Sequence, residues 1–331
     1  MKRITAFIAA LTLITGVLSG CSSAPANTSS QDSQPESTPA VTQAETTAEE
    51  PEAAAWPRTI VDATGAEIVL ERQPERVTLL HIVYMEHFLL LDSPPKAAAI
   101  GNAQGATEAL SASEMFAPYF EDSDMIVLGS SKDLSLEAVL ESAPDVIVTF
   151  FNAANAETVA QLAEIAPVVQ ISYADTWQDQ LMLCASVLGK ETEAEKIIAD
   201  TEKATADAKE ALSAHTDRSF ALFRTDGKSF IAQGMANYYG VFGLTRPEGF
   251  PDKAESLSLE AVAEMNPYYI VFQHNQEVAK TFVESVESSS VWQSLDAVKA
   301  GRVYYWDENM NSYGPLALQL ASEKLTALYS E

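Results

Sequence analysis

A fifteen-residue segment of this chain occurs twice, 123 residues apart, and this near-repeat constrains the fold more than any other feature of the sequence. Residues 134–148 read LSLEAVLESAPDVIV and residues 257–271 read LSLEAVAEMNPYYIV, identical at 10 of 15 positions. Each copy predicts a short helix capped by Ser135 or Ser258, then a turn at a proline and a buried strand. One copy in each half indicates two lobes of related architecture.

Apolar, strand-like runs alternate with helical stretches along most of the chain. Alternation of this kind predicts an α/β fold with parallel sheets and helices on both faces. The predicted strands of the first set are 76–81, 97–102, 126–130, 146–152 and 167–172; those of the second set are 220–224, 230–234, 269–273 and 302–307, with a final helix over 316–329.

A long helix is predicted between the two sets of strands. Residues 191–214 contain neither Gly nor Pro, and their apolar residues recur at helical spacing while Glu, Lys and Asp fill the other faces. About 24 residues at a rise of about 1.5 Å span roughly 36 Å, enough to join two lobes. We therefore expect an N-terminal lobe over 56–176, connecting helices over 177–214 and a C-terminal lobe over 215–331.

The first 21 residues have the pattern of an export signal. Lys2 and Arg3 precede an uncharged, mostly apolar run over 4–17, which is followed by Leu-Ser-Gly and Cys21. The run is shorter than the roughly 20 apolar residues of a transmembrane helix. LSGC also resembles the lipobox of bacterial lipoproteins, which implies a signal peptide over 1–20 and diacylglyceryl transfer to Cys21. The alternative is an ordinary signal peptide with a cysteine near its cleavage site.

Residues 21–55 have the composition of a disordered tether. They are rich in Ala, Ser, Thr, Pro, Gln and Glu, and contain neither Lys nor Arg. Such a segment cannot bury enough apolar surface to offset the entropy lost on ordering. We expect it to hold a folded body away from the extracytoplasmic face of the cell membrane.

Composition and motifs argue against several classes of function. The net charge of −27 disfavours binding to nucleic acid and to anionic lipid. The sequence contains no GxSxG, P-loop or HExxH motif, each of which would indicate an enzyme. The four histidines are scattered, and Cys184 is the only cysteine besides Cys21, so neither a metal cluster nor a disulfide framework is indicated. A surface-anchored enzyme or an adhesin is the alternative of another class.

Several segments together resemble a known family over residues 56–331: the ABC-transporter solute-binding lipoproteins for iron–siderophore complexes, haem and vitamin B12. The segments, in order, are IVDATGAEIVL, PERVTLL, LEAVLESAPDVIV, QLAEIAPVV, LGKETEAEKI, FRTDGKSFIAQG, LSLEAVAEMNP and VWQSLDAVKAGRVYYWD. The resemblance implies two Rossmann-like lobes joined by one long helix, the class III substrate-binding fold, with the ligand in a shallow cleft. It also implies a non-enzymatic, monomeric protein without a cofactor, which delivers a ferric siderophore to an ABC-importer permease. Haem or cobalamin is the alternative ligand.

The same resemblance suggests a role for the near-repeat. Family members present one exposed acidic residue on each lobe in this segment, and these residues meet arginines of the permease. The matching positions here are Glu137 and Glu260.

Candidate ligand-binding residues follow from the strand ends, because open α/β sheets bind ligands at the carboxyl ends of their strands. Arg224 ends an apolar strand where the family places a ligand-contacting arginine, and a buried guanidinium needs either a ligand or a carboxylate such as Asp226. Aromatic faces and an arginine suit a ferric siderophore, without direct protein ligands to the metal. The predicted ligand-binding residues are Arg224, Tyr238, Tyr239, Trp306, His81, Tyr84, Asn102 and Phe151.

Two ligand questions stay open at this point. A haem would need an axial ligand, for which His81, Met85 and Tyr239 are candidates. The scarcity of other basic residues in the strand-end loops argues against a highly anionic tris-catecholate and leaves hydroxamate and citrate-like chelates open.

Overall fold

The computed structural model describes residues 55–100, 106–120 and 123–330, which lie in a compact unit spanning Glu50–Glu331. Cys21, the predicted tether up to residue 54 and Asn102 are outside the described residues. Within the described part, no helix is both long and apolar enough to cross a membrane.

An antiparallel hairpin that the sequence analysis did not predict begins the described body. It consists of β1 (Arg58–Val61) and β2 (Glu67–Leu70). Asp62 shapes its turn: Oδ1 accepts hydrogen bonds from the N–H groups of Thr64 and Ala66 at 2.8 and 3.2 Å, while Oδ2 accepts one from Gln170 N–H at 3.1 Å. The last bond attaches the hairpin to a strand of the first lobe.

The N-terminal lobe contains a five-stranded, wholly parallel sheet in the order β5-β4-β3-β6-β7, which confirms the predicted parallel α/β unit. Its strands are shorter than predicted because the flanking residues leave the ladder at the strand ends. The elements are β3 (Val77–Leu79), β4 (Ala97–Ala98), β5 (Ile126–Val127), β6 (Val146–Phe150), β7 (Val168–Ile171), α1 (Met85–Leu90), α2 (Ala106–Ala112), α3 (Ala117–Phe120), α4 (Leu136–Glu141) and α5 (Ala156–Ala163), with 3-10 turns η1 (Ile82–Tyr84) and η2 (Ala153–Asn155).

The C-terminal lobe contains a mixed sheet in the order β10-β9-β8-β11-β12, so the prediction of a parallel sheet is wrong for part of this lobe. Only residues 226–229 link β8 to β9, and a parallel crossover needs about a dozen residues or more. The elements are β8 (Phe220–Thr225), β9 (Phe230–Gln233), β10 (Ala254–Leu257), β11 (Tyr269–Gln273), β12 (Val303–Trp306), α8 (Asn237–Phe242), α9 (Leu259–Met265), α10 (Gln276–Glu287), α11 (Ser290–Ser294), α12 (Asp296–Lys299), η4 (Glu308–Ser312) and α13 (Pro315–Ser330).

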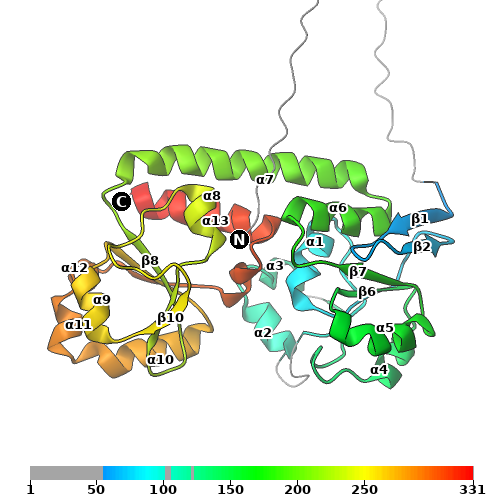
Figure 1. Cartoon of the computed structure of the whole chain (residues 1–331), viewed down its shortest axis with the longest axis horizontal. Helices are drawn as coiled ribbons and strands as arrows, with labels where there is room; N and C mark the ends of the chain where they lie inside the picture. Colours follow the sequence, from blue (N-terminus) through cyan, green and yellow to red (C-terminus); the bar gives the residue numbers. More distant parts are fainter. Residues whose placement is uncertain (1–54, 101–105, 121–122, 331) are drawn as a thin grey trace, which may run out of the picture. The chain divides into compact units, whose positions relative to one another are not determined.

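Two consecutive helices lie between the two sheets in the chain, and the second of them is the predicted long helix (Figure 1). The first, α6 (Trp177–Leu188), ends at Gly189, whose φ of 69° lies in the left-handed region that favours glycine. The second, α7 (Glu191–Leu212), runs into the 3-10 turn η3 (Ser213–His215) and packs against α6, α8 and α13. Its packed face is a narrow stripe of small residues and one leucine: Ala194, Thr201, Ala208 and Leu212.

The two copies of the near-repeat fold alike. Ser135 accepts a hydrogen bond from Ala138 N–H and Ser258 accepts one from Ala261 N–H, both at 3.2 Å, so each copy caps its helix as predicted. Each helix is followed by a residue with positive φ, Ala143 at 47° or Asn266 at 40°, again 123 positions apart. Each copy then continues into a central strand, β6 or β11.

Buried carboxylates tie the two lobes together. Glu86 of α1 accepts hydrogen bonds at Oε2 from the N–H groups of Leu316 and Ala317, at 2.9 and 3.1 Å, at the start of α13. Asp307, which follows β12, accepts hydrogen bonds from the hydroxyl of Ser113 and from the N–H of Met115 in the first lobe. The carboxylate of Glu86 fits here only because residue 314 is glycine: a Cβ there would lie 2.2 Å from Oε1.

Candidate functional site

Three hollows lie at the carboxyl ends of the parallel strands, and two of them are lined by residues of both lobes. One hollow of about 330 Å³ is lined by Ala109 and Ser113 from the first lobe and by the segments around His274 and Glu308 from the second. Another, of about 450 Å³, is lined by the segment after β7 and, from the second lobe, by Asn237 and residues 311–313. A third, of about 550 Å³, lies in the first lobe at the ends of β3 and β6. These three hollows define the cleft used below.

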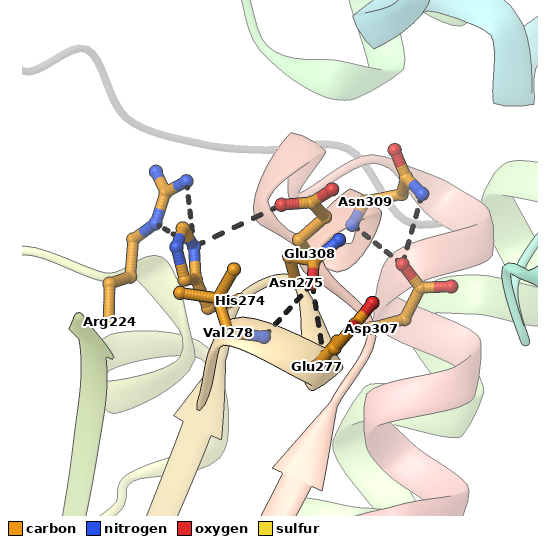
Figure 2. Close-up of polar contacts among 8 residues, drawn as sticks. All are labelled: Arg224, His274, Asn275, Glu277, Val278, Asp307, Glu308 and Asn309. Atoms are coloured by element: carbon orange, nitrogen blue, oxygen red, sulfur yellow. Dashed lines mark hydrogen bonds and ion pairs between the residues drawn. The ribbon is translucent and has the colours of Figure 1, made fainter. Parts of the chain in front are cut away.

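A half-buried arginine and a histidine lie side by side at the carboxyl ends of two strands of the second lobe (Figure 2). Arg224 of β8 directs Nε and Nη2 toward Nδ1 of His274, at 3.4 and 3.3 Å. His274 follows β11, and its Nδ1 lies 3.9 Å from Oε2 of Glu308, which follows β12. Burial and then the Arg224 charge lower the pKa of His274, with Glu308 opposing them, so the ring is neutral at pH 7 and can accept from the guanidinium.

Asp226, the carboxylate proposed from the sequence as an alternative partner, does not pair with Arg224. It accepts hydrogen bonds from the N–H groups of Lys228 and Ser229, both at 2.9 Å, and thereby shapes the β8–β9 turn. In the described part of the chain Arg224 forms no ion pair with a carboxylate. Its guanidinium therefore retains donors for a ligand in the cleft.

The polar loops around this pair are held in place by hydrogen bonds (Figure 2). Asn275 caps α10 by accepting from the N–H groups of Glu277 and Val278 at 3.1 and 3.2 Å. Asp307 is 5% exposed, and its Oδ1 accepts from the N–H and side-chain amide of Asn309 at 2.8 and 3.0 Å. Since Ser113 and Met115 occupy its other oxygen, this carboxylate is saturated and structural.

The first lobe contributes a cluster of aromatic rings. His81 accepts a hydrogen bond at Nδ1 from Val83 N–H at 3.3 Å, and its Nε2 lies 2.8 Å from the hydroxyl of Tyr173. Burial lowers the pKa of His81, so its neutral ring donates from Nε2 to the phenol oxygen. Phe150 packs edge-on against His81 at 5.2 Å between ring centroids. Tyr173 is 51% exposed and Phe151 44% exposed, so both offer aromatic surface at this edge of the sheet.

The prediction of ligand contact is wrong for four aromatic residues, because their side chains form the core. Tyr84 is fully buried and donates to Ile171 C=O at 3.3 Å; Tyr238, also fully buried, donates to Met310 C=O. Tyr239 donates to Phe220 C=O at 3.2 Å, and Trp306 packs against the rings of Phe220 and Tyr238. Met85 is likewise fully buried, which leaves His81 as the accessible member of the three candidate haem ligands.

Sequence reasoning missed four residues that line the cleft: Tyr173, His274, Glu308 and Tyr313. Three of them stand one or two positions after a strand, β7, β11 or β12. The rule that selected Phe151 and Arg224 would have selected these three if applied to every strand. Tyr313 follows a 3-10 turn with a φ of 55° and had no signal in the sequence.

The two glutamates predicted to contact a permease occupy equivalent places. Glu137 and Glu260 lie in the first turns of α4 and α9, and both are exposed. Neither forms a hydrogen bond or ion pair with another of the described residues. Among those residues, no group of three His, Cys, Asp or Glu side chains gathers to hold a metal ion.

Comparison with known proteins identifies the family. Residues 80–310 match the model of a periplasmic binding protein family. The iron-uptake system-binding protein of Bacillus subtilis (strain 168) is 32% identical over 222 residues, which cover 60% of this chain and 68% of the relative. The Fe(3+)-citrate-binding protein YfmC of the same organism is 24% identical over 320 residues, covering 93% of this chain and 90% of the relative.

Solved structures show the same fold. The crystal structure of the iron-uptake system-binding protein FeuA from Bacillus subtilis matches with a TM-score of 0.66 at 24% identity, covering 81% of this chain and 100% of that one. The siderophore binding protein BauB, bound to two molecules of acinetobactin and ferric iron, matches with a TM-score of 0.65 at 18% identity, covering 82% and 98%. With two α/β lobes joined by a long helix, the chain belongs to the Fe/B12 branch of the periplasmic binding proteins, has the class III fold, and is a substrate-binding protein and not an enzyme.

Proposed function

We propose that the protein captures a ferric siderophore outside the cytoplasm and delivers it to an ABC importer. The observation that carries the proposal is the cleft, which is lined by the exposed ring of Tyr173 and by His274, the residue that the Arg224 guanidinium contacts. Aromatic faces pack against the flat arms of a chelate, and a guanidinium donates to its oxygens. The names of the iron-uptake and Fe(3+)-citrate relatives and the ligand of BauB support this reading.

Titration with ferric chelates tests the proposal. Wild-type protein and Arg224→Ala are titrated with ferric hydroxamate, citrate and catecholate complexes by quenching of tryptophan fluorescence, with haem and cobalamin as controls. A charge-assisted hydrogen bond is worth roughly 1.5 to 3 kcal/mol, so we expect Arg224→Ala to weaken binding by about 10- to 150-fold. Lys196→Ala, which removes an exposed cation of α7, is the matched control and should bind like wild type. Tight binding of haem or cobalamin alone would contradict the siderophore proposal.

We further propose that Glu137 and Glu260 dock the protein onto the permease. Their support is their equivalence: the same residue in the same turn of two related helices, both exposed and both free of partners in the described body. A carboxylate in this position can receive an arginine in a charge-assisted, bidentate contact. Two such contacts, one from each lobe, would fix the orientation of the binding protein on its partner.

We also propose that Cys21 carries a lipid anchor and that residues 22–55 act as a tether on the extracytoplasmic face of the membrane. The support is the sequence pattern of Lys2, Arg3, the apolar run and LSGC. One relative, YfiY of Bacillus subtilis, is named a probable siderophore-binding lipoprotein.

A further inference from the structure

Ionisable side chains at the cleft carry a net negative charge. Six acidic and three basic residues line its hollows or lie between residues 224 and 228, at the end of β8 and in the turn that follows, a net charge of −3. The acidic residues are Asp133, Asp175, Asp226, Glu277, Asp307 and Glu308, and the basic residues are Lys132, Arg224 and Lys228. The neutral rings of His81 and His274 add no positive charge to this balance.

Four other basic residues lie next to strands, but at the amino ends of the strands and not at the carboxyl ends where the cleft lies. Arg76 immediately precedes β3, Lys96 precedes β4 and Arg302 precedes β12. Arg218 lies two residues before β8 and is held there by the C=O of Tyr329. Since charges farther apart than about 8 Å are largely screened at physiological salt, cations at the amino ends of the strands do little for a ligand at the carboxyl ends.

The two internal segments outside the described residues contain no Lys or Arg. Residues 101–105 read Gly-Asn-Ala-Gln-Gly and carry no ionisable side chain, and residues 121–122 are Glu-Asp. Outside the described residues, the only Lys or Arg are Lys2 and Arg3 in the predicted signal peptide.

Neutral hydrogen-bonding groups make up most of the remaining polar lining. Amides and hydroxyls come from both lobes, and they can donate to carbonyl oxygens and accept from amide N–H groups of a ligand. They are Asn275, Gln276 and Asn309 in the hollow of about 330 Å³; Gln178, Gln180, Asn237 and Asn311 in that of about 450 Å³; and Ser131, Thr149, Asn152, Asn155 and Thr158 in that of about 550 Å³.

Given the proposed function, on which this step rests, we infer that the ligand is a ferric tris-hydroxamate of zero or positive net charge. Three hydroxamates, each of charge −1, neutralise Fe³⁺, whereas three catecholates, each of charge −2, leave a complex of charge −3. The tris-catecholate would bring three negative charges into a cleft that is already negative. Of the three cations counted above, Arg224, which contacts the lining residue His274, is half-buried, and Lys132 and Lys228 are exposed. A tris-hydroxamate avoids this repulsion, and its linking amides match the neutral lining.

Three purified ferric chelates test the inference: neutral ferrichrome, ferrioxamine B with a pendant ammonium group, and the tris-catecholate ferric enterobactin. We expect both hydroxamates to bind at least 100-fold more tightly than the catecholate to the full-length protein. Raising the salt concentration should lower the affinity for ferrioxamine B and leave the affinity for ferrichrome almost unchanged.

Charge-neutralising variants provide the second part of the test. Glu308→Gln and Glu277→Gln should each increase the affinity for ferric enterobactin several-fold and decrease the affinity for ferrioxamine B. Glu141→Gln, on the exposed face of α4, should change neither affinity. Tighter binding of the catecholate by wild type would overturn the tris-hydroxamate inference while leaving the siderophore proposal intact. If none of the three chelates binds and haem or cobalamin does, the proposed function itself fails.

Discussion

Glu86 and His87 are adjacent and completely buried, and burial shifts their pKa values in opposite directions. Burial raises the pKa of Glu86 to about 7, although hydrogen bonds from the start of α13 partly oppose this effect. Burial also lowers the pKa of His87 to about 4, with a hydrogen bond to Gln180 opposing it. Both side chains therefore favour their neutral forms in the folded protein, and both link folding to pH.

These two linkages have opposite signs. Between about pH 4.5 and 7 the folded protein retains the Glu86 proton that the unfolded chain has lost, so this residue makes the free energy of unfolding fall as pH rises. Between about pH 4 and 6.5 the unfolded chain binds a proton at His87 that the folded protein does not, so this residue makes the free energy of unfolding rise with pH. In wild type the two contributions largely cancel where they overlap.

Glu86→Gln should therefore expose the effect of His87. We expect the unfolding free energy of this variant to rise between pH 4.5 and 6.5 more steeply than that of wild type, by on the order of 1 to 3 kcal/mol over the interval. Urea denaturation of both proteins at several pH values measures this. Glu141→Gln, an exposed substitution, serves as the control. Parallel pH profiles for wild type and Glu86→Gln would show that Glu86 is already ionised in the folded protein.

At the residue scale, sequence predicted the location of the site better than its members. The rule that ligands bind at the carboxyl ends of strands selected Arg224, His81 and Phe151, and all three lie at that edge of their sheets because the rule depends only on where apolar runs stop. It did not exclude Tyr238 and Tyr239, because two adjacent tyrosines at the start of a six-residue helix give no periodicity from which the buried face can be read. Which ring faces the core depends on how that helix packs.

Among the elements, α7 and β11 were the most predictable. The amphipathic pattern of α7 is long, and β11 is a continuous apolar run. The hairpin of β1 and β2 was missed because each strand has only four residues, most of them exposed or half-buried. The strand β9 was predicted but its antiparallel direction was not, because alternation of strands and helices indicates a parallel sheet only when a crossover separates the strands. The strand β10 was not predicted.

The paired helices α4 and α9 lead to a prediction about docking. Replacing both Glu137 and Glu260 by Ala should leave ligand affinity within a few-fold of wild type, because neither residue lines the cleft, but should strongly reduce uptake into cells. Chelate titration and uptake of radioactive iron measure the two effects.

The near-repeat supplies a matched control for this experiment. Glu141 and Glu264 lie four residues farther along the same two helices and are also exposed. Replacing both by Ala should preserve uptake. A large loss of ligand affinity in the Glu137 and Glu260 variant would instead place those residues in the binding site.

The whole molecule should change its shape little on binding ligand. Closing the lobes would require a break in the backbone hydrogen bonds of α7 or loss of the Glu86 and Asp307 contacts between lobes. We expect solution X-ray scattering to give nearly the same radius of gyration with and without ferric chelate. The variant Ser113→Ala, which lacks one of these contacts, should be the more mobile comparison. A large compaction of wild type on binding would contradict this expectation.

Membrane attachment is a second prediction for the whole molecule. Because stable anchoring takes two or more lipid chains, such as the diacylglyceryl group on a lipobox cysteine, Cys21→Ser should release the protein into the medium or the periplasm. Fractionation of cells followed by a high-salt wash of the membranes measures this. A Cys21→Ser protein that stays with washed membranes would show that something other than this cysteine holds it.

The contacts between the lobes bear on how a transporter tells a loaded carrier from an empty one. If the lobes keep their positions, Glu137 and Glu260 are the same distance apart in both forms, and a partner that senses only those two carboxylates would accept either. Ligand-free binding protein would then occupy importers without delivering a chelate, and an excess of it would slow uptake. Selective docking must therefore read the chelate itself, or side chains at the cleft rim such as Tyr173.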